Sequence, residues 1–82
     1  MEFQHHKKGA CEAPMDGKVA LISVQQGQRV NKGQDLIIIE SMKMENIITA
    51  PEQGVVKELF VKQGDFVKMG SILIAIDTEN NP

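Results

Sequence analysis

Residues 13–40 read "APMDGKVALISVQQGQRVNKGQDLIIIE", and residues 50–77 read "APEQGVVKELFVKQGDFVKMGSILIAID". The two segments align without a gap, and 12 of the 28 aligned positions are identical. Three glycines and both Ala-Pro pairs fall in register, which chance does not produce. An internal repeat of this kind indicates that one supersecondary unit occurs twice in the chain.

Each repeat is divided by turn residues in the same way. Ala-Pro-x-x-Gly predicts a turn into a β-rich run, and Gln-Gly-x-x-Val-x-x-Gly predicts two close bends before a Leu-Ile-x-Ile strand. Val and Ile favour strands, and the spacing of the glycines leaves no room for a long helix. We expect strands near 18–24, 35–40, 45–49, 55–61 and 72–77, with short extended pieces near 10–13, 29–31 and 66–68.

Two similar halves predict an all-β fold with pseudo-twofold symmetry, a flattened β-barrel or sandwich in which strands are exchanged between sheets. Residues 41–49 are expected to form a hairpin, the one link that is not repeated. We expect a domain over residues 12–78, between a flexible N-terminal tail at 1–11 and a solvated end at 79–82. The alternation in "LIIIE" and "ILIAI" is too weak to predict which face points inward.

Composition limits the function classes. A chain of 82 residues makes one domain at most, and its net charge of −2, with both signs interspersed, argues against nucleic acid or an anionic membrane as partner. No apolar run approaches the roughly 20 residues that span a bilayer, and no signal peptide is visible. Cys11 is the single cysteine, so no internal disulfide can form, and the cytoplasm is the expected compartment. With no Trp or Tyr, the core must be built from Val, Ile, Leu and Met.

The linking segment reads "ESMKMENIIT" over residues 40–49 and places Lys43 between Met42 and Met44 at the apparent tip of a hairpin. Tight hairpins normally use Gly, Asn or Asp there, because those residues tolerate positive φ. A broken local rule tends to mark a functional or strained site. Exposed methionines also offer a surface that another protein can grip. The alternative is a solvated lysine whose neighbouring methionines cover the barrel end.

The motif "ESMKMEN", with an Ala-Pro-x-x-Gly repeat on each side, resembles the biotinyl domain of biotin-dependent carboxylases and decarboxylases. The resemblance covers about residues 12–78. It implies a barrel of two four-stranded antiparallel sheets with covalent biotin on Lys43 at a protruding turn. It also implies that Met42 and Met44, and with a weaker claim Glu40, are recognised by a biotin protein ligase and by partner sites. Their structural roles otherwise are barrel-end packing and a strand-end charge.

The resemblance implies a carrier that is not itself an enzyme. Lys43 would be acylated by a separate ligase and would carry a carboxyl group between biotin carboxylase and carboxyltransferase or decarboxylase subunits or domains. The ungapped repeat leaves no space for the inserted "thumb" of some carriers, so the likeness is to the thumbless type. Ser41 stands where the family usually has alanine, which puts ligase efficiency in question. We expect the isolated domain to be monomeric.

Two other functions remain open. Lipoyl domains share the fold and the lysine position but typically flank the lysine with Asp and Ala, so the methionines favour biotin. An unmodified barrel acting as an adaptor would not need the lysine. No nucleophile with an acid-base partner is visible, and we interpret the pair His5-His6 as part of a tail rather than as a metal site.

Overall fold

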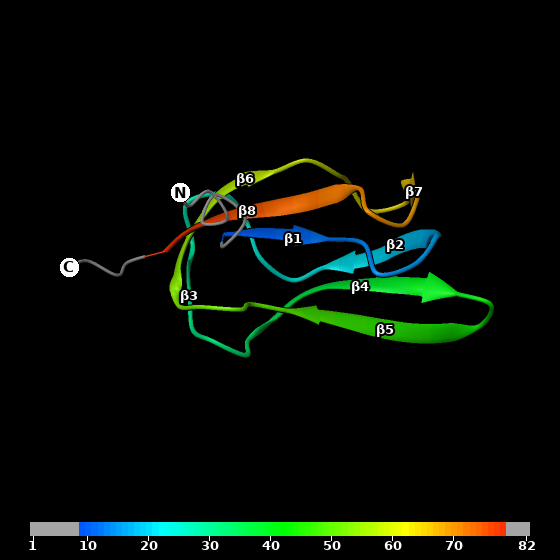
Figure 1. The fold of residues 1–82 in the computed structure, drawn as a ribbon, viewed down its shortest axis with the longest axis horizontal. Coiled ribbons are helices and arrows are strands. Elements are labelled where there is room, and N and C mark those ends of the chain that lie inside the picture. The colour runs from blue at the N-terminus through cyan, green and yellow to red at the C-terminus, as the bar shows by residue number, and fades with distance from the viewer. Residues whose placement is uncertain (1–8, 79–82) are drawn as a thin grey trace, which may run out of the picture.

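The computed structural model describes residues 9–78, and this part of the chain forms two four-stranded antiparallel sheets (Figure 1). The strands are β1 (Ala10–Glu12), β2 (Gly17–Ile22), β3 (Arg29–Val30), β4 (Asp35–Ser41), β5 (Met44–Thr49), β6 (Gly54–Leu59), β7 (Phe66–Val67) and β8 (Ile72–Thr78). One sheet has the order β5-β4-β2-β7 and the other β1-β8-β6-β3. The predicted all-β fold is confirmed. The pair His5-His6 and the expected end at 79–82 lie outside the described residues.

The two sheets are related by the repeat. A shift of one repeat length carries β2 onto β6, β3 onto β7 and β4 onto β8, so each half contributes strands to both sheets. The pairing register follows: Val19 faces Ile39 in one sheet, and Val56 faces Ile76 in the other. The turns also match, because the amide of Gly27 donates to the carbonyl of Val56 and the amide of Gly64 to that of Val19, both at 2.8 Å. These bonds run between the halves and close the barrel.

The symmetry extends further than the sequence suggested. Residues 47–49 of β5 pair with β4 as β1 pairs with β8: Ile48 faces Ile37, and Cys11 faces Ile74. The linking segment is therefore not wholly unrepeated, but no side chain in it matches its counterpart, so alignment could not find the relation. The extended piece predicted near 10–13 is β1, which begins at Ala10 and so includes the last two residues of the expected tail.

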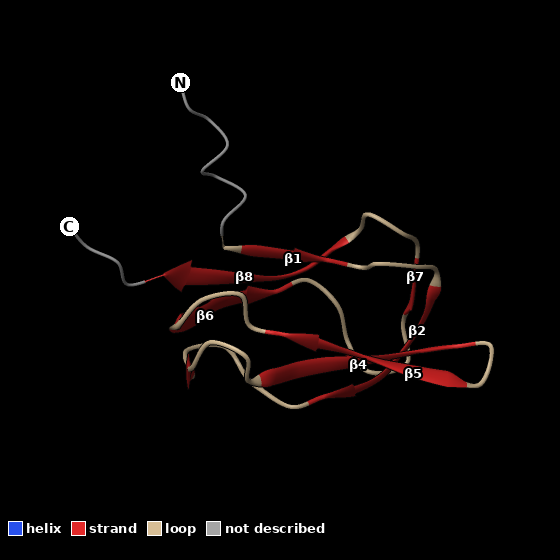
Figure 2. Cartoon of the chain, turned by 60° about the horizontal axis from the view of Figure 1, so that its bottom comes forward, coloured by secondary structure: helices blue, strands red, loops and turns tan. Residues whose placement is uncertain are grey.

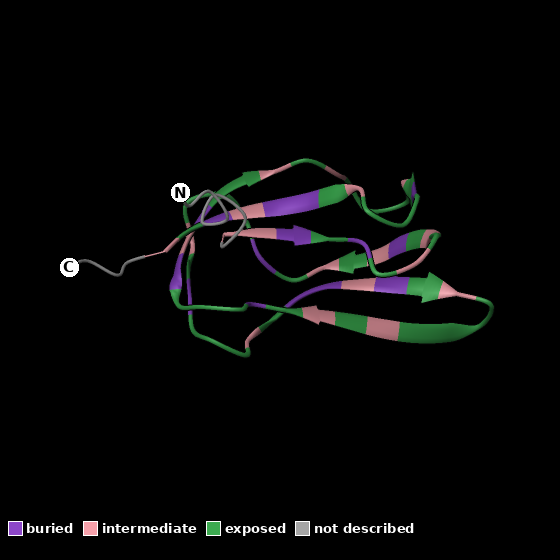
Figure 3. Ribbon diagram, in the orientation of Figure 1, coloured by how far each residue is buried: buried purple, intermediate pink, exposed green. Residues whose placement is uncertain are grey.

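The core lies between the sheets and consists of small and aliphatic side chains (Figure 3). Leu36 and Ile37 are adjacent in sequence, yet both are fully buried, because the ladder between β4 and β5 shifts register between Asp35 and Ile37. This bulge explains why strict alternation was not visible. The expectation of a methionine-containing core holds only at its margin, where Met15 is partly buried against the core. The buried hydrophobic residues are Cys11, Ala13, Val19, Val24, Val30, Leu36, Ile37, Ile39, Ala50, Val56, Val67, Leu73, Ile74 and Ile76.

The β4–β5 hairpin projects from one end of the barrel, as Figures 1 and 2 both show. The start of β1 and the end of β8 lie at the opposite end of a molecule whose longest dimension is 42 Å. Symmetry accounts for this arrangement, since one repeat length carries Ser41, the last residue of β4, onto Thr78, the last residue of β8. Within the described residues, no helix is long and apolar enough to cross a membrane.

Candidate functional site

The tip of the β4–β5 hairpin contains two residues, Met42 and Lys43. Ser41 at the end of β4 faces Met44 at the start of β5, so the ladder closes directly beneath the tip. Met42 has φ of 53° and Lys43 has φ of 67°. A two-residue type I′ hairpin turn requires positive φ at both of its central residues. This turn type is favoured in hairpins because its twist matches that of the flanking strands. The predicted hairpin is therefore present with the lysine in the turn itself.

This turn is strained. In the described residues, Met42 and Lys43 are the two non-glycine positions with positive φ, whereas the other bends with positive φ use glycine. A left-handed conformation costs roughly 1–2 kcal/mol for a residue with a Cβ. Continuous pairing from Ile38 opposite Ile47 to the end of the hairpin holds the tip in place. Strain that the surrounding structure maintains is characteristic of functional positions.

The tip is open to solvent. Met42 is 90% exposed, Met44 is 65% exposed, and Lys43 also belongs to the exposed residues. The methionines therefore do not pack over the barrel end, whereas the exposed lysine agrees with both interpretations of the tip. Among residues 9–78, Lys43 has no hydrogen-bond or ion-pair partner. An amine held this way is accessible to a protein that approaches along the long axis of the barrel.

Possible metal ligands and the cysteine are the other groups of chemical interest in residues 9–78. In the described part of the chain, no group of three or more His, Cys, Asp or Glu side chains could hold a metal ion. Cys11 is buried in β1, and desolvation by burial raises the pKa of its thiol, which keeps it in the unreactive neutral form.

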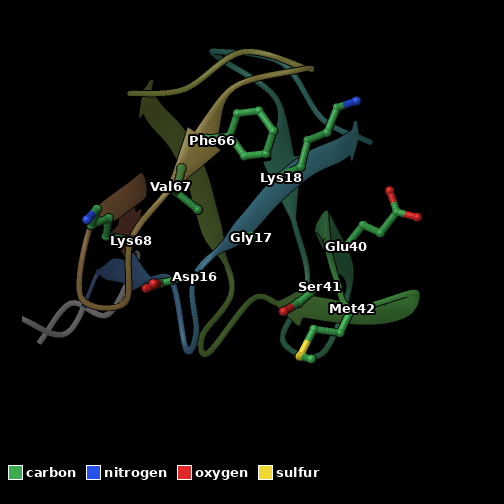
Figure 4. Close-up of a pocket in the computed structure, with 9 residues that line it drawn as sticks. All are labelled: Asp16, Gly17, Lys18, Glu40, Ser41, Met42, Phe66, Val67 and Lys68. Carbon is green, nitrogen blue, oxygen red and sulfur yellow. The ribbon is translucent and has the colours of Figure 1, made fainter.

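Glu40 and Ser41 connect the tip to the flank of the barrel. Glu40 is exposed near the end of β4, and Ser41 is partly buried. Together with Met42 they line a hollow of about 560 Å³ that reaches across β2 to Phe66 on β7 (Figure 4). The structure thus brings Glu40, Met42 and Lys43 to one end of the molecule. The roles assigned to Glu40, Met42 and Met44 in recognition stay predictions.

Two neighbours of the site were missed by sequence reasoning. Lys18 on β2 faces Glu40, and Phe66 on β7 faces Lys18, so a row of side chains crosses the sheet beneath the hairpin. Figure 4 shows Lys18 and Glu40 extending from the same side of the sheet. Phe66 comes from the second repeat and reaches this sheet by strand exchange. The predicted exchange of strands between the halves could have indicated that Phe66 joins this sheet, but not that it lies opposite Lys18.

Comparisons with known proteins agree with this geometry. The family model described as "Biotin-requiring enzyme" matches residues 10–76. The chain is 44% identical over 62 residues to the biotin/lipoyl attachment protein of Bacillus subtilis, which covers 76% of this chain and 85% of that protein. It is 39% identical over 75 residues to the alpha subunit of mitochondrial methylcrotonoyl-CoA carboxylase of Arabidopsis thaliana, which covers 92% of this chain and 10% of that subunit. The chain thus spans about a tenth of the length of that carboxylase subunit.

The fold also matches a solved domain of another class. The lipoyl domain of the 2-oxoglutarate dehydrogenase complex from Azotobacter vinelandii superposes with a TM-score of 0.77 at 26% identity, over 88% of this chain and 99% of that domain. The barrel by itself therefore does not distinguish a biotinyl domain from a lipoyl domain.

Proposed function

Because the chain belongs to the biotin/lipoyl attachment family as a carrier domain homologous to those of biotin-dependent carboxylases, we propose that Lys43 is its attachment point and that the attached group is biotin. The observation that carries the proposal is an exposed lysine without a partner in residues 9–78, held at positive φ in a two-residue turn. An amide on the Nζ atom needs space on every side, and this position provides it.

The chemistry at Lys43 is a simple acyl transfer. The attacking amine must be neutral, so a ligase must first take a proton from the ammonium group. The Nζ atom then attacks the carbonyl of an acyl-adenylate of biotin, the amide bond forms, and AMP leaves. Lys43 loses its positive charge in this step. When bound, biotin supplies a ureido nitrogen that takes up and gives back a carboxyl group.

The barrel contributes delivery. Cross-strand pairing from Asp35 to Met44 fixes the direction of the tip, so the acylated side chain extends away from the domain surface. When carrier and active sites share one assembly, each encounter is intramolecular, with an effective concentration on the order of millimolar for a short flexible link. We propose that the partner sites belong to a carboxylase or decarboxylase. The equal spacing of strands in the two halves supports a carrier of the thumbless type.

Met42 and Met44 favour biotin over lipoate, and the curated relatives compared above include a carboxylase subunit. The lipoyl alternative remains the second candidate because a lipoyl domain has the same fold. The adaptor alternative requires that the lysine be dispensable.

One experiment separates the three. The domain is incubated with ATP, biotin and a biotin protein ligase, and in parallel with ATP, lipoate and a lipoate ligase, before intact-mass measurement and peptide mapping. We expect one biotinyl group, on Lys43, and none in the Lys43→Arg variant. The matched variant Lys62→Arg, an exposed lysine outside the hairpin, should be modified as the wild type is. Uptake of lipoate alone would refute the proposal.

The adaptor alternative is tested in the cell. Lys43→Arg should abolish any biotin-dependent carboxylation that requires this chain, while Lys62→Arg should leave it unchanged. Full activity of the Lys43→Arg chain would show that the barrel works without a modified lysine.

A further inference from the structure

The hollow beside the hairpin begins next to the attachment lysine. Met42, the neighbour of Lys43 in the turn, lines one side of it. Phe66 and Val67 of β7 line the other side (Figure 4). The start of β2 lies between the two sides at Gly17, which has no side chain to fill the space. The volume of about 560 Å³ is in the range of small-molecule sites. We call this space the hairpin hollow.

Phe66 forms an aromatic wall of the hairpin hollow that the fold itself does not require. Its side chain is 81% exposed. The other repeat provides a comparison, because Phe66 faces Lys18 in one sheet and Arg29 faces Val55 at the equivalent positions of the other. The same strand pair therefore forms with a charged side chain in place of the ring. Two large apolar side chains, those of Phe66 and Met42, are thus left in solvent around one hollow, which is the composition of a binding site.

Two charged side chains at the hairpin hollow are available to a ligand. Lys18 and Glu40 face each other across β2 and β4 and both line the hollow. Within residues 9–78, neither side chain has an ion-pair or hydrogen-bond partner. The carboxylate of Glu40 can accept a hydrogen bond, and the ammonium group of Lys18 can donate one. The hollow therefore combines apolar walls with an acceptor and a donor.

The acylated side chain of Lys43 is long enough to reach this hollow. Neighbouring strands are about 4.8 Å apart, so Phe66, two strands from Glu40, lies about 10 Å from it across the sheet. Lys43 follows Glu40 by three residues, at the adjoining turn. From the Cα atom of Lys43 to the ring of a biotinyl group, an extended arm contains about eleven bonds and spans about 14 Å. The ring can therefore lie against Phe66 without movement of the backbone.

We propose that the hairpin hollow is a resting site for the biotinyl group carried on Lys43 of the same domain. This inference rests on the proposed function above. The apolar bicyclic ring packs against Phe66, and its thioether sulfur makes a favourable contact with the aromatic ring. A ureido N–H donates to the carboxylate of Glu40, and the ureido carbonyl accepts a hydrogen bond from Lys18.

The resting site holds the arm weakly, because its apolar walls are themselves exposed to solvent. Met42 is 90% exposed and Phe66 is 81% exposed, so neither can enclose the ring. The arm therefore alternates between the hollow and the extended position that delivery requires. A partner site that makes more contacts with the biotinyl group withdraws it from the hollow.

NMR spectroscopy of the fully biotinylated domain tests the contact directly. We expect nuclear Overhauser effects between the ring protons of Phe66 and the bicyclic ring of biotin. Biotinylation should also change the chemical shifts of Phe66 and Lys18, whereas those of Phe60, which follows β6 outside the hollow, should stay the same. Biotin signals identical to those of free biotinyl-lysine, without any effect at Phe66, would overturn the resting site.

The rate of capture by streptavidin measures the fraction of time for which the biotinyl group is free. Capture through a state that is only partly populated is slowed by that fraction. Phe66→Thr should therefore raise the capture rate constant about threefold, while the matched variant Phe60→Thr should leave it unchanged. Phe66→Arg, which introduces the residue present at the equivalent position 29, covers the case in which Phe66→Thr does not fold, and it should raise the rate too. Equal rates for the wild type and the folded Phe66 variants would overturn the proposal.

Intact mass and thermal unfolding, recorded for each protein beforehand, separate this proposal from the proposed function. A wild-type domain that takes up no biotin on Lys43 removes both. A fully biotinylated domain that shows neither the contact with Phe66 nor the difference in capture rate removes the resting site alone.

Discussion

The hairpin end and the opposite end of the barrel are built from the same repeat, and they differ where function is expected. At the opposite end, β8 finishes and β1 starts without a connecting turn in the described residues. At the hairpin end, two strained residues join β4 to β5 and expose an amine. Within residues 9–78 the scaffold is therefore duplicated, whereas the two-residue tip is present once. This difference separates what the fold requires from what has been added to it.

We expect the largest change in stability from substitutions at two equivalent glycines, Gly17 near the hairpin end and Gly54 near the opposite end. A Cβ at Gly17 would lie 2.7 Å from the carbonyl oxygen of Glu40, and a Cβ at Gly54 would lie 2.4 Å from that of Asp77. Because neither backbone can move without disturbing its ladder, Gly17→Ala and Gly54→Ala should each lower the free energy of unfolding by about 1–3 kcal/mol. Urea denaturation measures both.

The two alanine variants should differ in biotin uptake. Gly17→Ala displaces Glu40, three residues before Lys43, whereas Gly54→Ala acts at the other end. Gly17→Ala should therefore slow ligation at a temperature where both variants are folded. Equal ligation rates would show that recognition does not extend below the turn.

A smaller effect tests the strain at the tip. Met42→Gly places glycine at a φ of 53°, which it adopts without steric cost, so the free energy of unfolding should rise by about 0.5–1 kcal/mol. Met44→Gly, in β5, should instead destabilise the hairpin. Ligation of the stable Met42→Gly domain should fall if the ligase reads this side chain. An unchanged unfolding midpoint for Met42→Gly would mean that the strain relieved at the turn is no larger than the effect of the entropy that glycine adds to the unfolded chain.

The smallest effect concerns Cys11, whose counterpart in the other sheet is Ile48. Cys11→Val should change the free energy of unfolding by less than about 1 kcal/mol near neutral pH, because a buried thiol packs as a small apolar group. Burial raises the pKa of the thiol, so the unfolded chain loses this proton at a lower pH than the folded one. Wild-type stability should therefore fall relative to Cys11→Val as the pH rises above the ordinary value of a thiol. Parallel pH profiles for the two proteins would contradict the assignment.

Much of the fold could be read from the repeat, because Pro, Gly and β-branched residues specify turns and strands locally. The eight extended segments were predicted, although the strands ending at Ile22 and Leu59 stop before the expected 24 and 61. The equivalence of β1 with the second half of β5 could not be predicted from the sequence. It consists of equivalent strand pairing, whereas the paired residues differ, as Cys11 and Ile48 do. The inward-facing side of the strands could not be predicted either, because a bulge such as the one between Asp35 and Ile37 interrupts the alternation of buried and exposed residues.

For the site, the sequence indicated Lys43 through a violation of turn chemistry. It did not indicate that Met42 also has positive φ. The same sequence is compatible with a two-residue turn and with a three-residue turn, which place positive φ at different residues. Phe66 and Lys18 could not be placed near Glu40 without the register between β2 and β7, which depends on contacts between residues far apart in sequence.

The separation between the hairpin and the outer ends of β1 and β8 has a mechanical consequence. In a larger polypeptide, a segment continuing from either end would leave the barrel on the side away from Lys43. If that segment were flexible, the barrel would move about it as a rigid body. The length of the barrel, up to 42 Å, would then add to the distance that Lys43 can reach. Lys43 could then reach widely separated active sites of an assembly without a longer flexible segment.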